Sequence, residues 1–105
     1  MNSRRRSIDF ARIAGAALVS SETIVTRWLP YGRRDGAEWT AKNPKRADSR
    51  PGSFRVNLRS GRWADFATDD KGGDLVSLAA FLFDLRQDEA ALKVAEMIGV
   101  DPYGR

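Results

Sequence analysis

The side chains of this sequence with the clearest capacity for chemistry are arginines and lysines, and they are unevenly distributed. Residues 1–62 carry 14 Lys and Arg against 5 Asp and Glu, whereas residues 63–105 carry 4 against 9. A basic half of this size suits a polyanion, because each phosphate that it neutralises releases condensed counterions. The alternative interpretation is a solvated basic face that serves solubility. Of the two, the charge pattern favours a nucleic-acid partner.

The candidate contacts are basic side chains on predicted strands and loops, together with one aromatic residue. Arg55, Asn57 and Arg59 alternate onto one face of a predicted strand, and Arg62 lies across the next turn. Phosphate contacts combined with stacking on a flat ring suit single-stranded nucleic acid. Trp63 could share this face or belong to the core. The candidate nucleic-acid contacts are Arg33, Arg34, Lys42, Lys45, Arg46, Arg50, Arg55, Arg59, Arg62 and Trp63.

Absent residue types narrow the function further. The chain has no cysteine and no histidine, so thiolate and imidazole ligands, disulfides and histidine-based catalytic pairs are excluded. Asp65, Asp69, Asp70 and Asp74 form an acidic cluster that could suggest magnesium, but Asp is also common in turns and at helix N-caps. We expect no catalytic site, no cofactor and no bound metal.

Hydrophobic periodicity predicts four helices, two at each end of the chain. Ser7 could cap the first, a second covers residues 20–29 and ends before Pro30, and Asp74 and Asp88 are the expected caps of the last two. Trp28 and Trp39 are expected in the core. The predicted apolar stripes are Phe10, Ile13, Ala14 and Ala17; Ile24, Val25, Trp28 and Leu29; Leu75, Leu78, Ala79 and Leu82; and Ala91, Val94, Ala95 and Ile98, with Gly99 as the final stop.

Between the helix pairs the pattern alternates with a period of two. This predicts strands at 38–42, 53–58 and 62–66, with a tight turn at Ser60-Gly61 that makes the last two a hairpin. Arg33 and Arg34 are expected in the loop before the first strand, and residues 43–52 in an exposed loop. The predicted fold is α+β: a small antiparallel sheet between two N-terminal helices and a C-terminal helical hairpin. We expect a flexible basic arm at 1–6, one domain at 7–100 and a frayed tail at 101–105.

Three segments of the sequence carry a resemblance to a known family. They are Asn43-Pro44-Lys45-Arg46, then Gly52-Ser53-Phe54-Arg55-Val56-Asn57, and finally Gly72-Gly73-Asp74 before an apolar helix. Over about residues 38–98, their order and spacing resemble the N-terminal zinc-binding domain of bacterial and phage DNA primases. That family has Cys-Pro-x-His before a Pro-Ser-Phe-x-Val-Asn strand, and Cys-x-x-Cys before Gly-Gly-Asp. The resemblance implies a zinc-ribbon-like sheet.

The departure from the family is complete at the metal. The four ligand positions hold Asn43, Arg46, Phe66 and Asp69, and zinc sites of this type need thiolate and imidazole. In place of zinc we expect Phe66 to turn inward as an apolar plug, Arg46 to pair with Asp69, and Asn43 to bind a loop backbone. An exposed ion pair contributes only about 0–1 kcal/mol, so the helical hairpin against the sheet should supply most of the stability.

Together these features predict a non-catalytic, cytoplasmic module that binds nucleic acid, with single-stranded DNA favoured. The family resemblance implies a role in DNA replication, in a phage, plasmid or other mobile element. The alternative is an adaptor or inhibitor that docks on a helicase, a primase or a host protein through the acidic half, with Asp84, Asp88, Glu89 and Glu96. No apolar run approaches the roughly 20 residues of a membrane span, so we expect no membrane contact.

Overall fold

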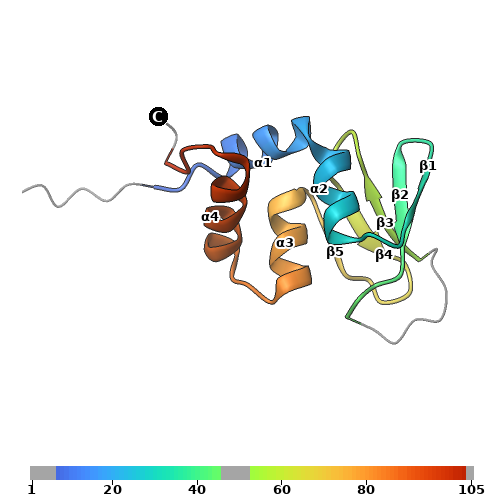
Figure 1. Ribbon diagram of the computed structural model, residues 1–105. Coiled ribbons are helices and arrows are strands. Elements are labelled where there is room, and N and C mark those ends of the chain that lie inside the picture. The colour runs from blue at the N-terminus through green and yellow to red at the C-terminus, as the bar shows by residue number, and fades with distance from the viewer. Residues whose placement is uncertain (1–6, 46–52, 104–105) are drawn as a thin grey trace, which may run out of the picture.

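The chain folds as the predicted α+β arrangement, with two helices before an antiparallel sheet and two helices after it. The computed structural model describes residues 7–45 and 53–103. Helices α1, α3 and α4 lie together at one end, the sheet lies at the other, and α2 lies between them (Figure 1). The helices are α1 (Phe10–Val19), α2 (Ser21–Trp28), α3 (Leu75–Phe83) and α4 (Gln87–Ile98); the strands are β1 (Arg33–Asp35), β2 (Glu38–Ala41), β3 (Phe54–Asn57), β4 (Trp63–Asp65) and β5 (Lys71–Gly72).

The sheet is a five-stranded antiparallel meander in the order β1-β2-β3-β4-β5. Because side chains alternate along a strand, residues that pair across neighbouring strands point to the same face. Phe54, Val56 and Trp63 are buried and point to the face that the helices cover. The opposite, outer face carries a row of residues aligned by the register: Arg33, Thr40, Arg55, Ala64 and Lys71.

The core joins this buried face of the sheet to α3. The Phe81 ring lies 4.9 Å from the Trp63 ring and 6.1 Å from the Phe54 ring, measured between centroids. The start of α3 is set by Asp74, as predicted, because its side chain accepts a hydrogen bond from the Ser77 amide at 2.8 Å. Helix α3 then buries Leu75, Val76, Leu78 and Ala79, and α4 packs against it as the predicted hairpin.

Gly72 in β5 permits the close packing of Trp63. The Trp63 indole donates a hydrogen bond to Ser77 Oγ at 2.9 Å, directly beneath the β5 backbone. A Cβ atom at Gly72 would collide with both the indole nitrogen and the Ser77 hydroxyl. The Gly-Gly-Asp segment therefore has a packing role at its first glycine and a capping role at its aspartate.

Two predicted helix starts are wrong. Asp9 rather than Ser7 caps α1, and its side chain accepts from the Arg12 amide at 3.0 Å. Asp88 does not cap α4, because the helix starts at Gln87, one residue earlier. The Glu89 carboxylate instead accepts from the Arg86 amide at 2.9 Å. In both cases several neighbouring polar residues could cap, and side-chain reach decided which one does.

The loop predicted around Arg33 and Arg34 is instead the edge strand β1. Asp35 ends this strand, and Gly36 and Ala37 form a two-residue hairpin turn into β2, with Gly36 at a φ of 62°. Such a positive φ suits glycine, which is favoured at the first position of a two-residue hairpin turn. The two-residue strand β5 was not predicted either, since its length leaves no periodicity to detect.

The C-terminal segment is held against the start of α1. The Asp9 amide donates to the Pro102 carbonyl at 2.8 Å, and the Tyr103 amide donates to Asp101 at 2.9 Å. The predicted fraying of the tail stays a prediction, and the predicted arm at 1–6 lies outside the described residues. Within the described part of the chain, we find no helix with the length and apolar character to cross a membrane.

Candidate nucleic-acid interface

The outer face of the sheet contains a hollow of about 620 Å³, which we call the outer hollow. Strands β2 to β5 form its floor, and the β3–β4 turn and the residues after β4 form its walls. Its lining combines cations, hydroxyl and amide groups and one exposed aromatic ring. The residues that line it are Glu38, Arg55, Asn57, Ser60, Arg62, Trp63, Ala64, Phe66, Lys71, Gly72 and Gly73.

Two cations of the outer hollow have charges that no described residue neutralises. Arg62 and Lys71 are exposed, and neither side chain makes an ion pair with any residue of 7–45 or 53–103. Arg55 differs, because its guanidinium contacts the Glu38 carboxylate at 3.2 Å. Both side chains of that pair are more than a third exposed, so its energetic contribution is small. Two free cations and one partly neutralised cation therefore face the same hollow.

Phe66 supplies the exposed aromatic ring, which corrects the prediction that it plugs the core. It is 72% exposed and lines the outer hollow. The reason is strand alternation: Asp65 at the end of β4 points inward, so Phe66 turns outward. Its amide donates to the Ser53 carbonyl at 2.9 Å, which holds the residue beside β3. A ring in this position can stack on a base.

Trp63 belongs to the core, the second of the two predicted alternatives. It is only 5% exposed, packs against Phe54 and Phe81, and satisfies its indole N–H with Ser77. Trp63 also lines the outer hollow, although nearly all of the residue is buried. Of the two alternatives for Trp63 the structure therefore shows the core, whereas Phe66, predicted to be in the core, is exposed.

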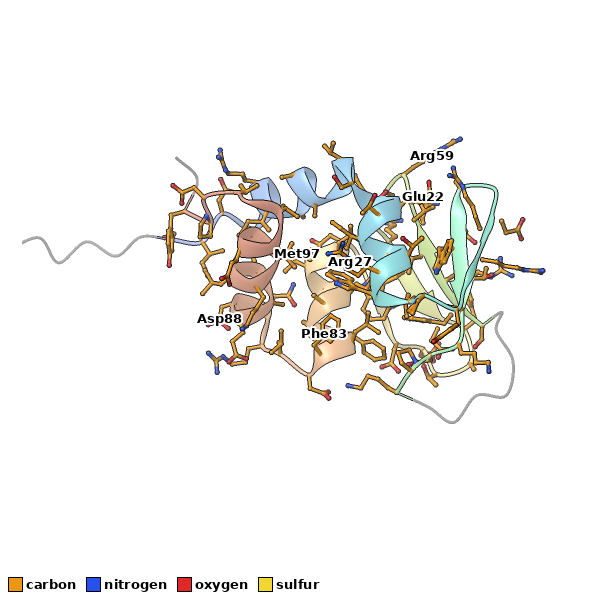
Figure 2. All side chains as sticks on the ribbon, viewed as in Figure 1. Glu22, Arg27, Arg59, Phe83, Asp88 and Met97 are labelled. Atoms are coloured by element: carbon orange, nitrogen blue, oxygen red, sulfur yellow. The ribbon has the colours of Figure 1, made fainter. Side chains whose placement is uncertain are left out.

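The other predicted cations that the structure describes do not converge on the hollow. Arg33 and Arg34 point to opposite faces of β1, and Arg34 pairs with Glu22 of α2 at 2.6 Å. Arg59 projects from the end of the β3–β4 connection (Figure 2). Lys42 follows β2 and lines a separate pocket beside α2. Arg46 and Arg50 lie outside the described residues.

Lys45, also predicted to contact nucleic acid, is engaged within the domain. Its ammonium group pairs with the Asp84 carboxylate, donates to the Phe81 carbonyl at 3.0 Å, and lies 5.1 Å from the centroid of the Phe81 ring. These contacts tie the loop after β2 to the C-terminal end of α3, where a cation is favoured by the helix dipole. The charge of Lys45 is thereby used structurally.

At the position of the family's zinc ligands, the structure has a buried polar junction. The Asn43 amide group donates to the Asp65 carboxylate at 2.8 Å, and the two residues are 1% and 0% exposed. Asn43 Oδ1 accepts from the Lys45 amide and Asp65 Oδ1 from the Ala67 amide, each at 2.9 Å. The prediction that Asn43 binds a loop backbone is confirmed. This Asn43–Asp65 junction joins the segment after β2 to the end of β4.

The residues at the ligand positions do not suit zinc. Asn43 is committed to Asp65, and Phe66 offers no ligand atom and faces solvent. Asp69 is exposed in a turn with a φ of 68°, and the predicted Arg46–Asp69 pair lies partly outside the described residues. Among residues 7–45 and 53–103, no three His, Cys, Asp or Glu side chains gather as a metal-binding group.

Three of the acidic residues considered as a partner surface form ion pairs within the domain. Besides Asp84, which pairs with Lys45, both Asp88 and Glu89 contact Arg86, at 3.1 and 3.5 Å. The Arg86 hydrogen bond lowers the pKa of Asp88 below its ordinary value, although desolvation opposes this shift. These pairs leave the acidic half with less free charge than its composition indicates.

Comparison with known proteins shows the fold. The solved structure of the Aquifex aeolicus primase, comprising its zinc-binding and RNA polymerase domains, matches with a TM-score of 0.73 and 22% identity. The match covers 90% of this chain and 22% of that chain, so the sequence spans about a fifth of the primase structure. No family model and no curated protein matches the sequence. The predicted likeness to a primase is thus confirmed as a likeness of fold.

Proposed function

We propose that this domain is a non-catalytic module that binds single-stranded DNA across the outer face of its sheet. The observation that carries the proposal is the outer hollow, where Arg62 and Lys71 have no partner among the described residues and Phe66 is displayed beside them. Cations that track phosphates and a ring that stacks on bases are the two components of single-strand recognition. An open sheet face also admits a strand without requiring a groove-reading helix.

The primase-like fold supports a place for this module in DNA replication. The chain spans only about a fifth of the primase structure, so nucleotide polymerisation is not part of the proposal. The residue types agree with a binding role, because the chain contains no histidine or cysteine and Glu38 of the outer hollow is paired with Arg55. The proposed partner is therefore a nucleic-acid strand. The chain itself would act as a domain or subunit of a larger replication assembly.

A titration of labelled single- and double-stranded oligonucleotides at two salt concentrations tests the proposal. Fluorescence anisotropy should show tighter binding of the single strand, weakening with salt by a log–log slope of about −0.7 per phosphate contact. The double variant Arg62→Glu/Lys71→Glu should lose most of this affinity, because like charges would then face the phosphates. Failure of the unaltered protein to bind any oligonucleotide at low salt would overturn the proposal.

A matched control separates location from net charge. Arg12→Glu/Lys93→Glu makes the same change in charge on α1 and α4, far from the outer hollow in the fold, at two exposed positions. Oligonucleotide affinity should fall only slightly in this variant. If both double variants lose affinity equally, binding follows the net charge of the domain and the outer hollow is not the site.

A further inference from the structure

On the helix side of the sheet, a second hollow of about 260 Å³ lies between the end of α2 and the end of β2. Its apolar lining comes from Trp28, Leu29, Pro30, Ala41 and Pro44, and we call it the apolar pocket. Ala41 points to the helix-covered face, opposite the row that contains Arg55 and Lys71. The apolar pocket and the outer hollow are therefore on different sides of the sheet.

The chemistry of the apolar pocket specifies what can enter it. Its volume is below the roughly 300–1,000 Å³ typical of small-molecule sites, so it suits a single anchoring side chain. The Leu29 carbonyl at its wall already accepts from Trp39 Nε1 at 2.9 Å and from the Gly32 amide at 3.2 Å. Pro30 and Pro44 have no backbone N–H to offer. An apolar group loses nothing on entering, whereas a nucleobase would bury its polar edge unpaired, at about 1–3 kcal/mol.

The rim of the apolar pocket adds a charge and an aromatic surface. Lys42 lines it, is exposed, and makes no ion pair or hydrogen bond through its side chain with any residue in the described ranges. Tyr31 also lines it and is 92% exposed, so most of its ring is uncovered. A positive rim around an apolar cavity complements a negatively charged segment that carries an apolar side chain.

We propose that the apolar pocket binds an acidic peptide segment of a partner protein, with one aromatic or aliphatic side chain inserted against Trp28 and Ala41 and a carboxylate beside Lys42. This site goes beyond DNA binding, since a strand on the outer hollow and a peptide in the apolar pocket would occupy opposite sides of the sheet. The domain would then connect a nucleic-acid strand to a second protein.

The test uses the full chain and a short labelled peptide of aspartates with one central phenylalanine. Two control peptides replace phenylalanine with alanine, or the aspartates with asparagines. Tryptophan indole N–H signals report the location by NMR, because Trp28 lines the apolar pocket and Trp63 borders the outer hollow. The acidic phenylalanine peptide should shift the Trp28 signal and leave Trp63 unchanged, and both control peptides should bind more weakly.

Variants on the two sides of the sheet complete the test. Lys42→Glu should weaken the peptide by about tenfold, since it places like charges together, and Tyr31→Ala should weaken it without any change of charge. Lys71→Glu should leave the peptide unaffected, although it faces the DNA proposed for the outer hollow. Both Lys42 and Tyr31 are exposed, so these variants should keep the thermal unfolding midpoint of the unaltered protein.

Three results would overturn the peptide proposal. They are the absence of peptide binding, a peptide that shifts Trp63 instead of Trp28, and a Lys42→Glu variant that loses oligonucleotide but not peptide. The last result would place a nucleic-acid strand in the apolar pocket. The first two results do not bear on whether Arg62 and Lys71 bind DNA, because that question is answered with a different ligand and different variants.

Discussion

The Asn43–Asp65 junction and the outer hollow use polar groups in opposite ways. At the junction, a buried amide and a buried carboxylate bind one another and the amides of two loops. In the outer hollow, Arg62 and Lys71 face solvent and have no ion-pair partner among the described residues. Polar groups satisfied inside the fold hold it together, and those left unsatisfied on its surface are available to a ligand.

The same distinction applies to cations that look equivalent in the sequence. Lys45 pairs with Asp84 and donates to the Phe81 carbonyl, and Arg34 pairs with Glu22. Lys71, which lies in the acidic half of the chain, has no ion-pair partner among residues 7–45 and 53–103. The local charge of a segment is therefore a poor guide to which cations bind phosphate, because neighbours brought by the fold decide which of them remain available.

The largest effect should follow from breaking the junction. Asn43→Ala removes a donor from the buried Asp65 carboxylate and an acceptor from the Lys45 amide, and should destabilise the domain by about 3 kcal/mol. Chemical denaturation measures this change. Asp69→Asn, at another former ligand position, is the control and should change stability by less than about 0.5 kcal/mol, because Asp69 is exposed and Asn tolerates positive φ. Equal losses of stability in the two variants would contradict the structural role assigned to Asn43.

A smaller effect should follow from removing the exposed ring of the outer hollow. Phe66→Ala should weaken single-stranded oligonucleotide binding by about 1–2 kcal/mol through lost stacking, with nearly unchanged stability because the ring is 72% exposed. Trp63→Phe should instead lower stability more than oligonucleotide affinity, because it removes the hydrogen bond to Ser77 within the core. A Phe66→Ala variant that unfolds easily but binds normally would contradict the assignment.

A still smaller effect, on the salt dependence of binding, should distinguish Lys71, which has no ion-pair partner among the described residues, from Lys45, which pairs with Asp84. Lys71→Ala should reduce the slope of log affinity against log salt by about 0.7, the loss of one phosphate contact on a single strand. Lys45→Ala should leave the slope unchanged and instead lower stability slightly, because it removes the contacts with Asp84 and Phe81. Anisotropy titrations over a series of salt concentrations measure both slopes. Identical slopes for the two variants would show that Lys45 remains available to DNA.

The smallest effect concerns pH and the exposed pair at the start of α4. The Arg86 hydrogen bond lowers the pKa of Asp88, so the pair stabilises the fold above the ordinary Asp pKa, and this contribution disappears as pH falls through the lowered value. Arg86→Ala should raise the pKa of Asp88 towards its ordinary value. NMR titration of the Asp88 carboxyl carbon measures this shift, and an unchanged pKa would contradict the cause assigned here.

The sequence alone determined the order of elements and the identity of most buried positions. Period-two alternation at 53–58 and the Asp74 cap before an apolar helix are local signals, because each depends on residues within one strand or one helical turn. The spaced Ser-Phe-x-Val-Asn and Gly-Gly-Asp segments extended these signals to a primase-like fold. The residue types alone likewise showed that the four positions that correspond to primase zinc ligands hold neither cysteine nor histidine.

Only the tertiary structure decided which side chains were buried together and which remained free. Strand alternation placed Asp65 inward beside Asn43 and Phe66 outward to solvent, which corrected the predicted role of Phe66 and decided between the two alternatives for Trp63. Partners such as Glu22 for Arg34 and Asp84 for Lys45 lie 12 and 39 residues apart, beyond any local pattern. Availability for binding is a property of these long-range contacts, and for that reason the basic half of the sequence indicated a ligand class without locating its site.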